Sequence, residues 1–144
     1  MYTTATTKEA ITIIIEINTQ STTPIYEQLR NQIVLGIASN KLLPSEALPS
    51  VRNLAADLGI NYLTVNKAYT MLCDEGYIVI DRRKGAMVAK AVANDEVALS
   101  KLSEQLTLTA AEAACRNMSE NDFISFCIEC YKNAKGIQVN GGII

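Results

Sequence analysis

The spacing of apolar and polar positions changes several times along the chain, and each change predicts a new element. Residues 11–17 are mostly β-branched and are bounded by polar residues, which predicts a strand. Pro24 suits the first turn of a helix, and apolar residues recur on one side of this helix to about Ser39. Residues 40–49 contain two prolines and lose this period, so we expect a loop there.

Two short amphipathic helices follow, with a glycine between them. Ser50 can cap the first helix, and Gly59 can end it. Asn61 can cap the second helix, and in both helices the apolar residues recur at i, i+3, i+4 and i+7. Two such helices joined by a turn of about three or four residues are the helix-turn-helix pattern.

After Gly76 the period changes from helical to extended. Residues 77–80 and 86–89 each predict a strand, and the charged residues 81–85 between them predict a turn. A basic hairpin that directly follows a helix-turn-helix is the wing of a winged-helix domain.

The helical period returns at Asp95 and is interrupted near Asn117, after which Ser119 can cap a second helix. These two helices carry more apolar surface than a pair of helices can cover by itself. We therefore expect the segment to pair with its own copy about a two-fold axis, although it could also fold back onto the winged-helix domain. The side chains expected at this contact are Leu99, Leu102, Leu106, Phe123, Phe126 and Tyr131.

Together these elements predict a mainly α fold with a small β-hairpin wing, that is, a winged helix-turn-helix followed by a C-terminal helical hairpin. We assign residues 10–90 to a DNA-binding domain, residues 93–135 to a helical dimerisation segment and residues 136–144 to a tail.

Charge is distributed unevenly around a net value of −2. Residues 24–90 hold eight Lys/Arg and six Asp/Glu, a net of +2, whereas residues 91–144 hold four and seven, a net of −3. The more basic part coincides with the winged helix-turn-helix, where phosphate would be approached. No apolar run approaches a membrane span, and residues 1–8 lack the features of a secretory signal. We therefore expect a cytoplasmic protein with no membrane partner.

The chain has four cysteines and no histidine, which excludes His-based acid–base catalysis and Cys/His zinc sites. Cys127 and Cys130 form a CxxC motif, but they lie in mid-helix on the apolar face rather than at a helix N-terminus. We interpret them as small buried hydrophobic residues, and we expect no enzyme, metal or cofactor. A thiol- or metal-responsive sensor that uses this pair is the alternative.

Several short motifs follow one another along the chain: Pro24-Ile25-Tyr26-Glu27-Gln28, Leu48-Pro49-Ser50-Val51-Arg52, Leu54-Ala55, Thr64-Val65, Lys67-Ala68-Tyr69 and Glu75-Gly76. In this order they resemble the GntR family of bacterial transcriptional regulators. The short C-terminal segment is similar to that of its YtrA-like subfamily. We therefore expect a transcriptional regulator that binds an operator in double-stranded DNA, usually as a repressor. The expected two-fold homodimer makes this operator an inverted repeat. The sequence does not identify a small-molecule effector.

This chain departs from the family pattern at three places. Asn40 and Ser45 stand where the family usually has glycine, which allows the loop a different course. The sequences 61–65 and 82–88 also differ from the usual recognition-helix and wing patterns. These changes alter the residues that would read bases, and so the operator sequence, more than they alter the fold.

A recognition helix brings its N-terminal residues close to base edges in the major groove. With the apolar positions of the second helix facing inward, we expect contacts from Asn61, Tyr62, Thr64, Asn66 and Lys67.

The resemblance adds Arg52, at the start of the preceding helix. The wing adds Arg82, Arg83 and Lys84, next to Gly85, where the backbone can approach DNA closely. Alternatively, these are ordinary solvated residues on a winged-helix module that binds another protein.

Overall fold

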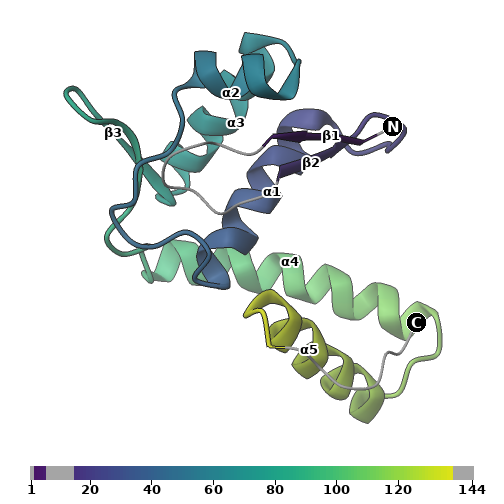
Figure 1. Ribbon diagram of the computed structural model, residues 1–144. Coiled ribbons are helices and arrows are strands. Elements are labelled where there is room, and N and C mark those ends of the chain that lie inside the picture. Colours follow the sequence, from purple (N-terminus) through teal and green to yellow (C-terminus); the bar gives the residue numbers. More distant parts are fainter. Residues whose placement is uncertain (1, 6–14, 138–144) are drawn as a thin grey trace. The chain divides into compact units, whose positions relative to one another are not determined.

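In the computed structural model, which describes residues 2–5 and 15–137, a winged helix-turn-helix is followed by two further helices (Figure 1). The contacts divide the chain into two compact units, Met1–Val92 and Ala93–Ile144. The elements are β1 (Tyr2–Ala5), β2 (Ile15–Asn18), α1 (Ile25–Ala38), α2 (Val51–Leu58), α3 (Tyr62–Asp74), β3 (Ile78–Asp81), β4 (Gly85–Val88), α4 (Glu96–Cys115) and α5 (Glu120–Ala134).

The predicted fold class is confirmed, with a two-stranded antiparallel wing directly after the helix-turn-helix. The strand expected over residues 11–17 is present as β2, which pairs with β1 in antiparallel register from Ile15 to Asn18. Residues 11–14 of that prediction, and residues 138–144 of the expected tail, lie outside the described residues.

The core of the first unit is built from the predicted apolar faces of its helices, together with β2 and the wing. Leu29 and Ile33 of α1 pack in one buried cluster with side chains from α2 and α3. The buried residues of α2 and α3 are those that the spacing selects: Leu54, Ala55, Leu58, Val65, Ala68, Tyr69 and Leu72. Each helix of the pair therefore turns its opposite, polar side to solvent.

Caps mark the start of α2 and the two ends of the turn between α2 and α3, as predicted. The hydroxyl of Ser50 accepts a hydrogen bond from the backbone N–H of Asn53 at 3.1 Å, at the start of α2. Gly59 ends α2 with a φ of +64°, in the left-handed region that favours glycine. Asn61 then caps α3 through its side-chain oxygen, which accepts from the N–H of Leu63 at 2.8 Å.

Helix α1 begins one residue later than expected, because Pro24 occupies the N-cap position and no side chain caps the helix there. Two glutamines of α1 instead bind the backbone of β2. Gln28 accepts from the N–H of Asn18 at 2.9 Å and donates to its carbonyl at 3.0 Å. Gln32 bonds both backbone groups of Glu16 in the same way. Gln28 and Gln32 are four residues apart, which is about 6 Å along a helix. Asn18 and Glu16 are two residues apart, which is about 6.6 Å along a strand. The two spacings are nearly equal, so each amide can bond one of these two residues of β2.

The loop between α1 and α2 extends the wing rather than running free of it. The N–H of Leu48 donates to the carbonyl of Ala86 at 2.8 Å, and the N–H of Val88 donates to Glu46 at the same distance. Ala47 consequently forms a single bridge to Met87 of β4. This isolated bridge attaches the wing to the segment that leads into α2.

Asn40 and Ser45 keep the backbone conformation that glycine favours, with φ values of 57° and 64°. The replacement of the family glycines therefore leaves these two positions left-handed. The cost of this conformation is smaller for Asn than for Ser, because the short amide side chain of Asn tolerates it better.

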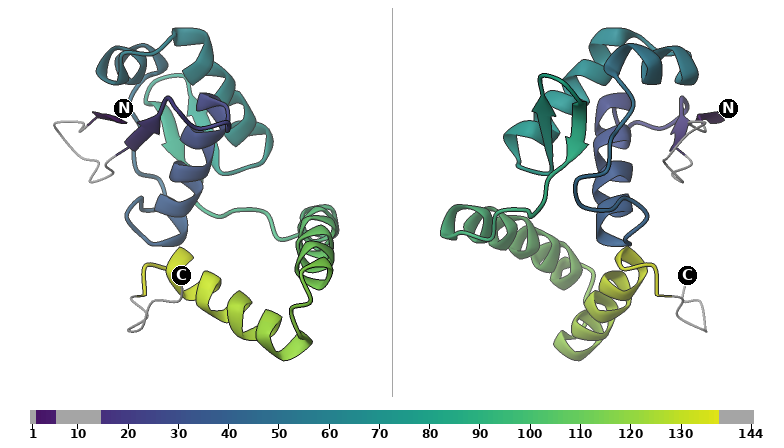
Figure 2. Two further views of the ribbon diagram at one scale, coloured as in Figure 1. Left: turned by 90° about the vertical axis from the view of Figure 1, so that its right-hand side faces the viewer. Right: turned by 60° about the vertical axis from the view of Figure 1, so that its left-hand side comes forward.

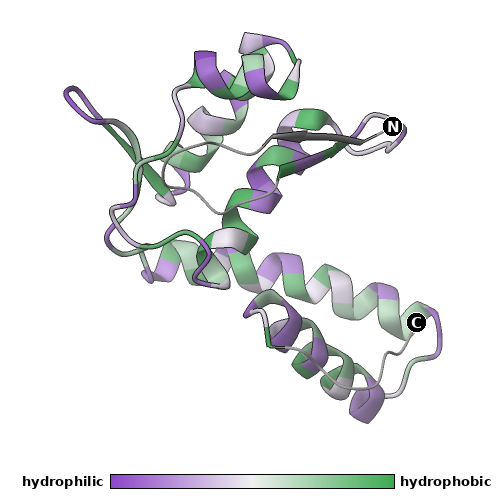
Figure 3. Cartoon of the chain, viewed as in Figure 1, coloured by the Kyte–Doolittle hydropathy of each residue, from purple (hydrophilic) through white to green (hydrophobic). Residues whose placement is uncertain are grey.

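Helices α4 and α5 form the C-terminal helix pair of the second unit. Asp95 caps α4, and Ser119 caps α5 as predicted. Asn117, with a φ of 59°, makes the turn between them. Neither helix has a buried residue, and apolar and polar residues are interspersed along both (Figure 3).

Candidate nucleic-acid interface

The start of α2 and the first two turns of α3 carry most of the predicted DNA contacts. Arg52 is exposed on the first turn of α2. In α3, Tyr62, Asn66 and Lys67 are exposed, whereas Thr64 is half-buried. Thr64 therefore offers less of its side chain to a ligand than its neighbours do.

A buried tyrosine fixes the start of α2 relative to α3. Tyr69 lies on the inner side of α3 with only 2% of its surface exposed, and its hydroxyl donates to the carbonyl of Pro49 at 2.8 Å. Burial also raises the pKa of this hydroxyl well above its usual value, because the charged phenolate is disfavoured away from water. The bond ties the residue before the Ser50 cap to the middle of α3, and it thereby orients the two helix starts.

The cap at Asn61 changes what this residue can offer to a base. Bidentate pairing with adenine uses both the oxygen and the NH2 group of an asparagine. Here the oxygen already accepts from the N–H of Leu63, so the NH2 group is the part of the side chain left to donate outward. Asn66 is exposed one turn later, and its side chain is in no hydrogen bond that caps the helix.

Lys67 is exposed, but its ammonium group lies against the ring of a residue from another helix. Its Nζ atom lies 3.7 Å from the centre of the Tyr26 ring, which is a cation–π contact between α3 and α1. This contact restricts the long side chain before any ligand arrives. Spacing within α3 alone could not reveal it, because Tyr26 is 41 positions away in the sequence.

The wing tip presents three exposed cations on a turn that one carboxylate organises. Asp81 accepts hydrogen bonds from the backbone N–H groups of Arg83 at 2.7 Å and Lys84 at 2.8 Å. The N–H of Lys84, and then that of Arg83, lower the pKa of the Asp81 carboxyl. Gly85 closes the turn with a φ of +77°. Figure 3 shows the hydrophilic tip at the end of the hairpin.

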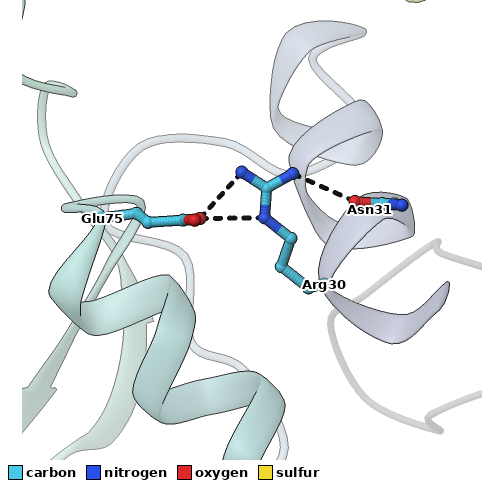
Figure 4. Close-up of polar contacts among 3 residues, drawn as sticks. All are labelled: Arg30, Asn31 and Glu75. Atoms are coloured by element: carbon cyan, nitrogen blue, oxygen red, sulfur yellow. Dashed lines mark hydrogen bonds and ion pairs between the residues drawn. The ribbon is translucent and has the colours of Figure 1, made fainter. Parts of the chain in front are cut away.

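An ion pair joins the first helix to the end of the recognition helix (Figure 4). The Nε and Nη2 atoms of Arg30 each lie 2.8 Å from the same carboxylate oxygen of Glu75, the C-cap residue of α3. The guanidinium also lies 5.5 Å from the centre of the Tyr77 ring, just before β3. Both partners are partly buried, and the pair links α1 to the end of α3, just before the wing.

These elements bring the predicted contact residues onto one unit of the chain. In the two views of Figure 2 the three helices α1, α2 and α3 and the wing hairpin lie together, and α3 contacts α1, α2 and strand β3 of the wing. Arg52, the α3 residues and the wing cations are exposed, with Thr64 half-buried. Their contacts with DNA remain predictions.

The interpretation of the CxxC pair as buried residues is wrong for the single chain. Cys127 is half-buried and Cys130 is exposed, and α5 has no buried residue. Within the described part of the chain, no three His, Cys, Asp or Glu side chains are grouped so that they could hold a metal ion. No described helix is long and apolar enough to cross a membrane.

The geometry defines a winged helix-turn-helix DNA-binding protein. Residues 22–88 match the model of the bacterial regulatory proteins of the gntR family. Over 102 residues the chain is 33% identical to the uncharacterised HTH-type transcriptional regulator YhcF of Bacillus subtilis, covering 70% of this chain and 80% of that protein. The chain therefore belongs to the GntR family and is a DNA-binding transcriptional regulator, not an enzyme.

Two further similarities agree with the expected subfamily and fold. The HTH-type transcriptional repressor YtrA of Bacillus subtilis is 39% identical over 77 residues, which are 54% of this chain and 59% of that one. A crystal structure of a transcriptional antiterminator from Listeria monocytogenes superposes with a TM-score of 0.78 at 26% identity, covering 88% of this chain and 96% of the other.

Proposed function

We propose that this chain is a repressor that binds an inverted-repeat operator as a homodimer. The observation that carries the proposal is the exposed apolar surface of a helix pair attached to a DNA-binding unit. Neither α4 nor α5 has a buried residue, and Tyr131 is 69% exposed. Leu99, Leu102, Leu106 and Phe126 are also exposed, and Phe123 is half-buried.

A second copy of the helix pair is the occupant that best fits this surface. Burial of apolar area is worth about 25 cal/mol per Å², so several leucine and aromatic side chains can hold two copies together. A two-fold axis would also present two recognition helices to successive major grooves, and the operator would then be an inverted repeat. We assign residues 93–135 to this dimer and residues 10–90 to DNA binding.

In each copy, we assign base reading to the first two turns of α3 and phosphate contacts to Arg52 and the wing tip. The three wing cations lie on a turn whose glycine leaves the backbone open to close approach. The similarity to the HTH-type transcriptional repressor YtrA supports repression as the direction of control. We expect this to take place in the cytoplasm, where bacterial DNA lies.

The test of DNA binding selects bound duplexes from random DNA and measures affinity against salt concentration. We expect inverted repeats. The variant Lys84→Ala should weaken binding to all duplexes alike, because it removes a phosphate contact. The slope of log affinity against log salt concentration should fall in magnitude by about one. Asn66→Ala should instead cost roughly 1–3 kcal/mol on the selected operator and relax preference at one position in each half-site. A protein that binds no duplex in a salt-dependent manner would be a winged-helix module for protein contact.

The test of the dimer compares two variants of α4 by sedimentation. Leu102→Glu places a charge on the predicted contact and should give a monomer at micromolar concentration. Ser100→Glu adds the same charge on a different face of the helix and should leave the dimer intact. A wild-type protein that sediments as a monomer would contradict the assignment.

A further inference from the structure

The first turn of the recognition helix has two exposed large apolar residues, Tyr62 and Leu63, and Leu63 is the more exposed of the two. Leu63, in the first turn of α3, is 68% exposed. The other large aliphatic side chains of α3, Val65 and Leu72, are completely buried in the core. Most of the Leu63 side chain contacts solvent rather than the core of the chain. It is therefore available to a partner.

The cap of α3 restricts the position of Leu63. The side-chain oxygen of Asn61 accepts from the backbone N–H of Leu63 itself at 2.8 Å, which fixes the first turn of the helix. Leu63 is therefore presented on an ordered backbone. Lys67 follows it four residues later on the same face, with its ammonium group held 3.7 Å from the centre of the Tyr26 ring. An apolar group at the helix start is thus followed by a cation one turn further along.

This order of side chains suits one particular feature of the major groove. The only apolar group that a base pair presents there is the C5 methyl of thymine. Residues at the N-terminus of a recognition helix come closest to the base edges. We propose that Leu63 contacts the methyl group of a thymine and selects that base at one position in each operator half-site. This proposal rests on the proposed function, since it requires that α3 enters the major groove.

The test removes single methyl groups from the DNA. In the selected operator, each thymine is replaced in turn by deoxyuridine, which pairs identically but lacks the C5 methyl. We expect the full-length protein to lose affinity about fourfold per half-site at one position and to be little affected at the others. Replacing that T·A pair by C·G should weaken binding further, and 5-methylcytosine at the same position should recover part of the loss.

Two variants identify the side chain responsible. Leu63→Ala should bind the thymine operator as weakly as the wild type binds the deoxyuridine operator, and it should lose all sensitivity to deoxyuridine. Leu35→Ala removes a leucine of α1 that is also exposed, and it should keep the wild-type sensitivity. Since Leu63 is exposed, its variant should have an unchanged melting temperature, which separates a binding effect from a folding effect.

The outcomes distinguish this inference from the proposed function. Tight, sequence-specific binding that is insensitive to deoxyuridine at every position would overturn the role of Leu63 alone. The same conclusion follows if Leu63→Ala retains the wild-type sensitivity. Failure of the wild-type protein to bind any duplex specifically would overturn both proposals. The exposed Leu63 would then be assigned to a contact with another protein.

Discussion

Single residues with unusual backbone geometry determine the path of the loop before α2. Ser45 adopts a φ of 64°, and its N–H donates to the carbonyl of Val88 at 3.0 Å, so its conformation is tied to the wing. A side chain with a Cβ atom is strained in the left-handed region, whereas glycine is not.

We therefore expect Ser45→Gly to raise the free energy of unfolding by about 0.5–1 kcal/mol. Relief of the left-handed strain stabilises the folded state, and the greater entropy of glycine in the unfolded chain offsets part of this stabilisation. Urea denaturation measures this difference. Ser45→Ala is the matched control, because alanine keeps the Cβ atom and should give no gain. A destabilised Ser45→Gly variant would mean that the serine side chain stabilises the loop by more than the strain costs.

The contact between Lys67 and Tyr26 is a second effect at the scale of the residue. It joins the recognition helix to α1, with the ammonium 3.7 Å from the ring centre. A double-mutant cycle with Tyr26→Leu and Lys67→Met should give a coupling energy of about 0.5–1 kcal/mol in the free protein, because each single change removes the same contact.

Thermal or urea unfolding of the four proteins provides the measurement. Tyr26→Phe is the control, since it keeps an aromatic ring beneath the ammonium and should preserve the coupling. If the changes at Tyr26 and Lys67 are simply additive, the contact does not stabilise the free protein.

At the scale of the element, the wing depends on the carboxylate that organises its tip. Asp81 accepts from two backbone N–H groups of the turn, which lower its pKa. A carboxylate with a lowered folded-state pKa contributes stability above its unfolded pKa, and this contribution is lost only as the pH falls through the folded value. The wing turn should therefore be ordered without change from pH 8 to pH 6.

The two functions of Asp81 can be separated by substitution. Asp81→Asn keeps an oxygen acceptor for the turn and removes one negative charge beside the three wing cations, so it should strengthen binding to all duplexes alike. Asp81→Ala removes the charge and the acceptor together, and we expect binding weaker than that of Asp81→Asn because the tip is less ordered. Fluorescence anisotropy with unrelated duplexes measures both. Equal affinity of the two variants would show that the turn bonds do not matter for binding.

At the scale of the whole molecule, the core and the exposed apolar helices belong to different units. Every buried hydrophobic side chain among the described residues lies between Ile15 and Ala89. The first unit therefore has a hydrophobic core of its own.

A protein truncated after Val92 should consequently remain folded, sediment as a monomer and bind the operator more than about tenfold more weakly than the full chain, because the second half-site is no longer linked to the first. Circular dichroism, sedimentation and operator titration measure the three properties. A truncated protein that is still dimeric would place the dimer contact in the first unit.

Local sequence was sufficient to predict most of the elements. The helix-turn-helix and wing followed from apolar periods of 3.6 and 2, and Ser50, Gly59 and Asn61 marked helix ends because caps act over only two or three residues. These signals depend on neighbours in the sequence, so no tertiary information was needed to read them.

Tertiary structure decided how these elements are held together and which side chains remain exposed. The bond from Tyr69 to Pro49, the Arg30–Glu75 ion pair and the pairing of the α1 glutamines with β2 all join residues 10 or more positions apart. Cys130 lies on a face that periodicity predicted to be buried, yet it is exposed, because a helix pattern identifies an apolar face but not whether its own chain covers that face. Burial and long-range hydrogen bonds depend on which surfaces meet in space, and only the folded chain determines that.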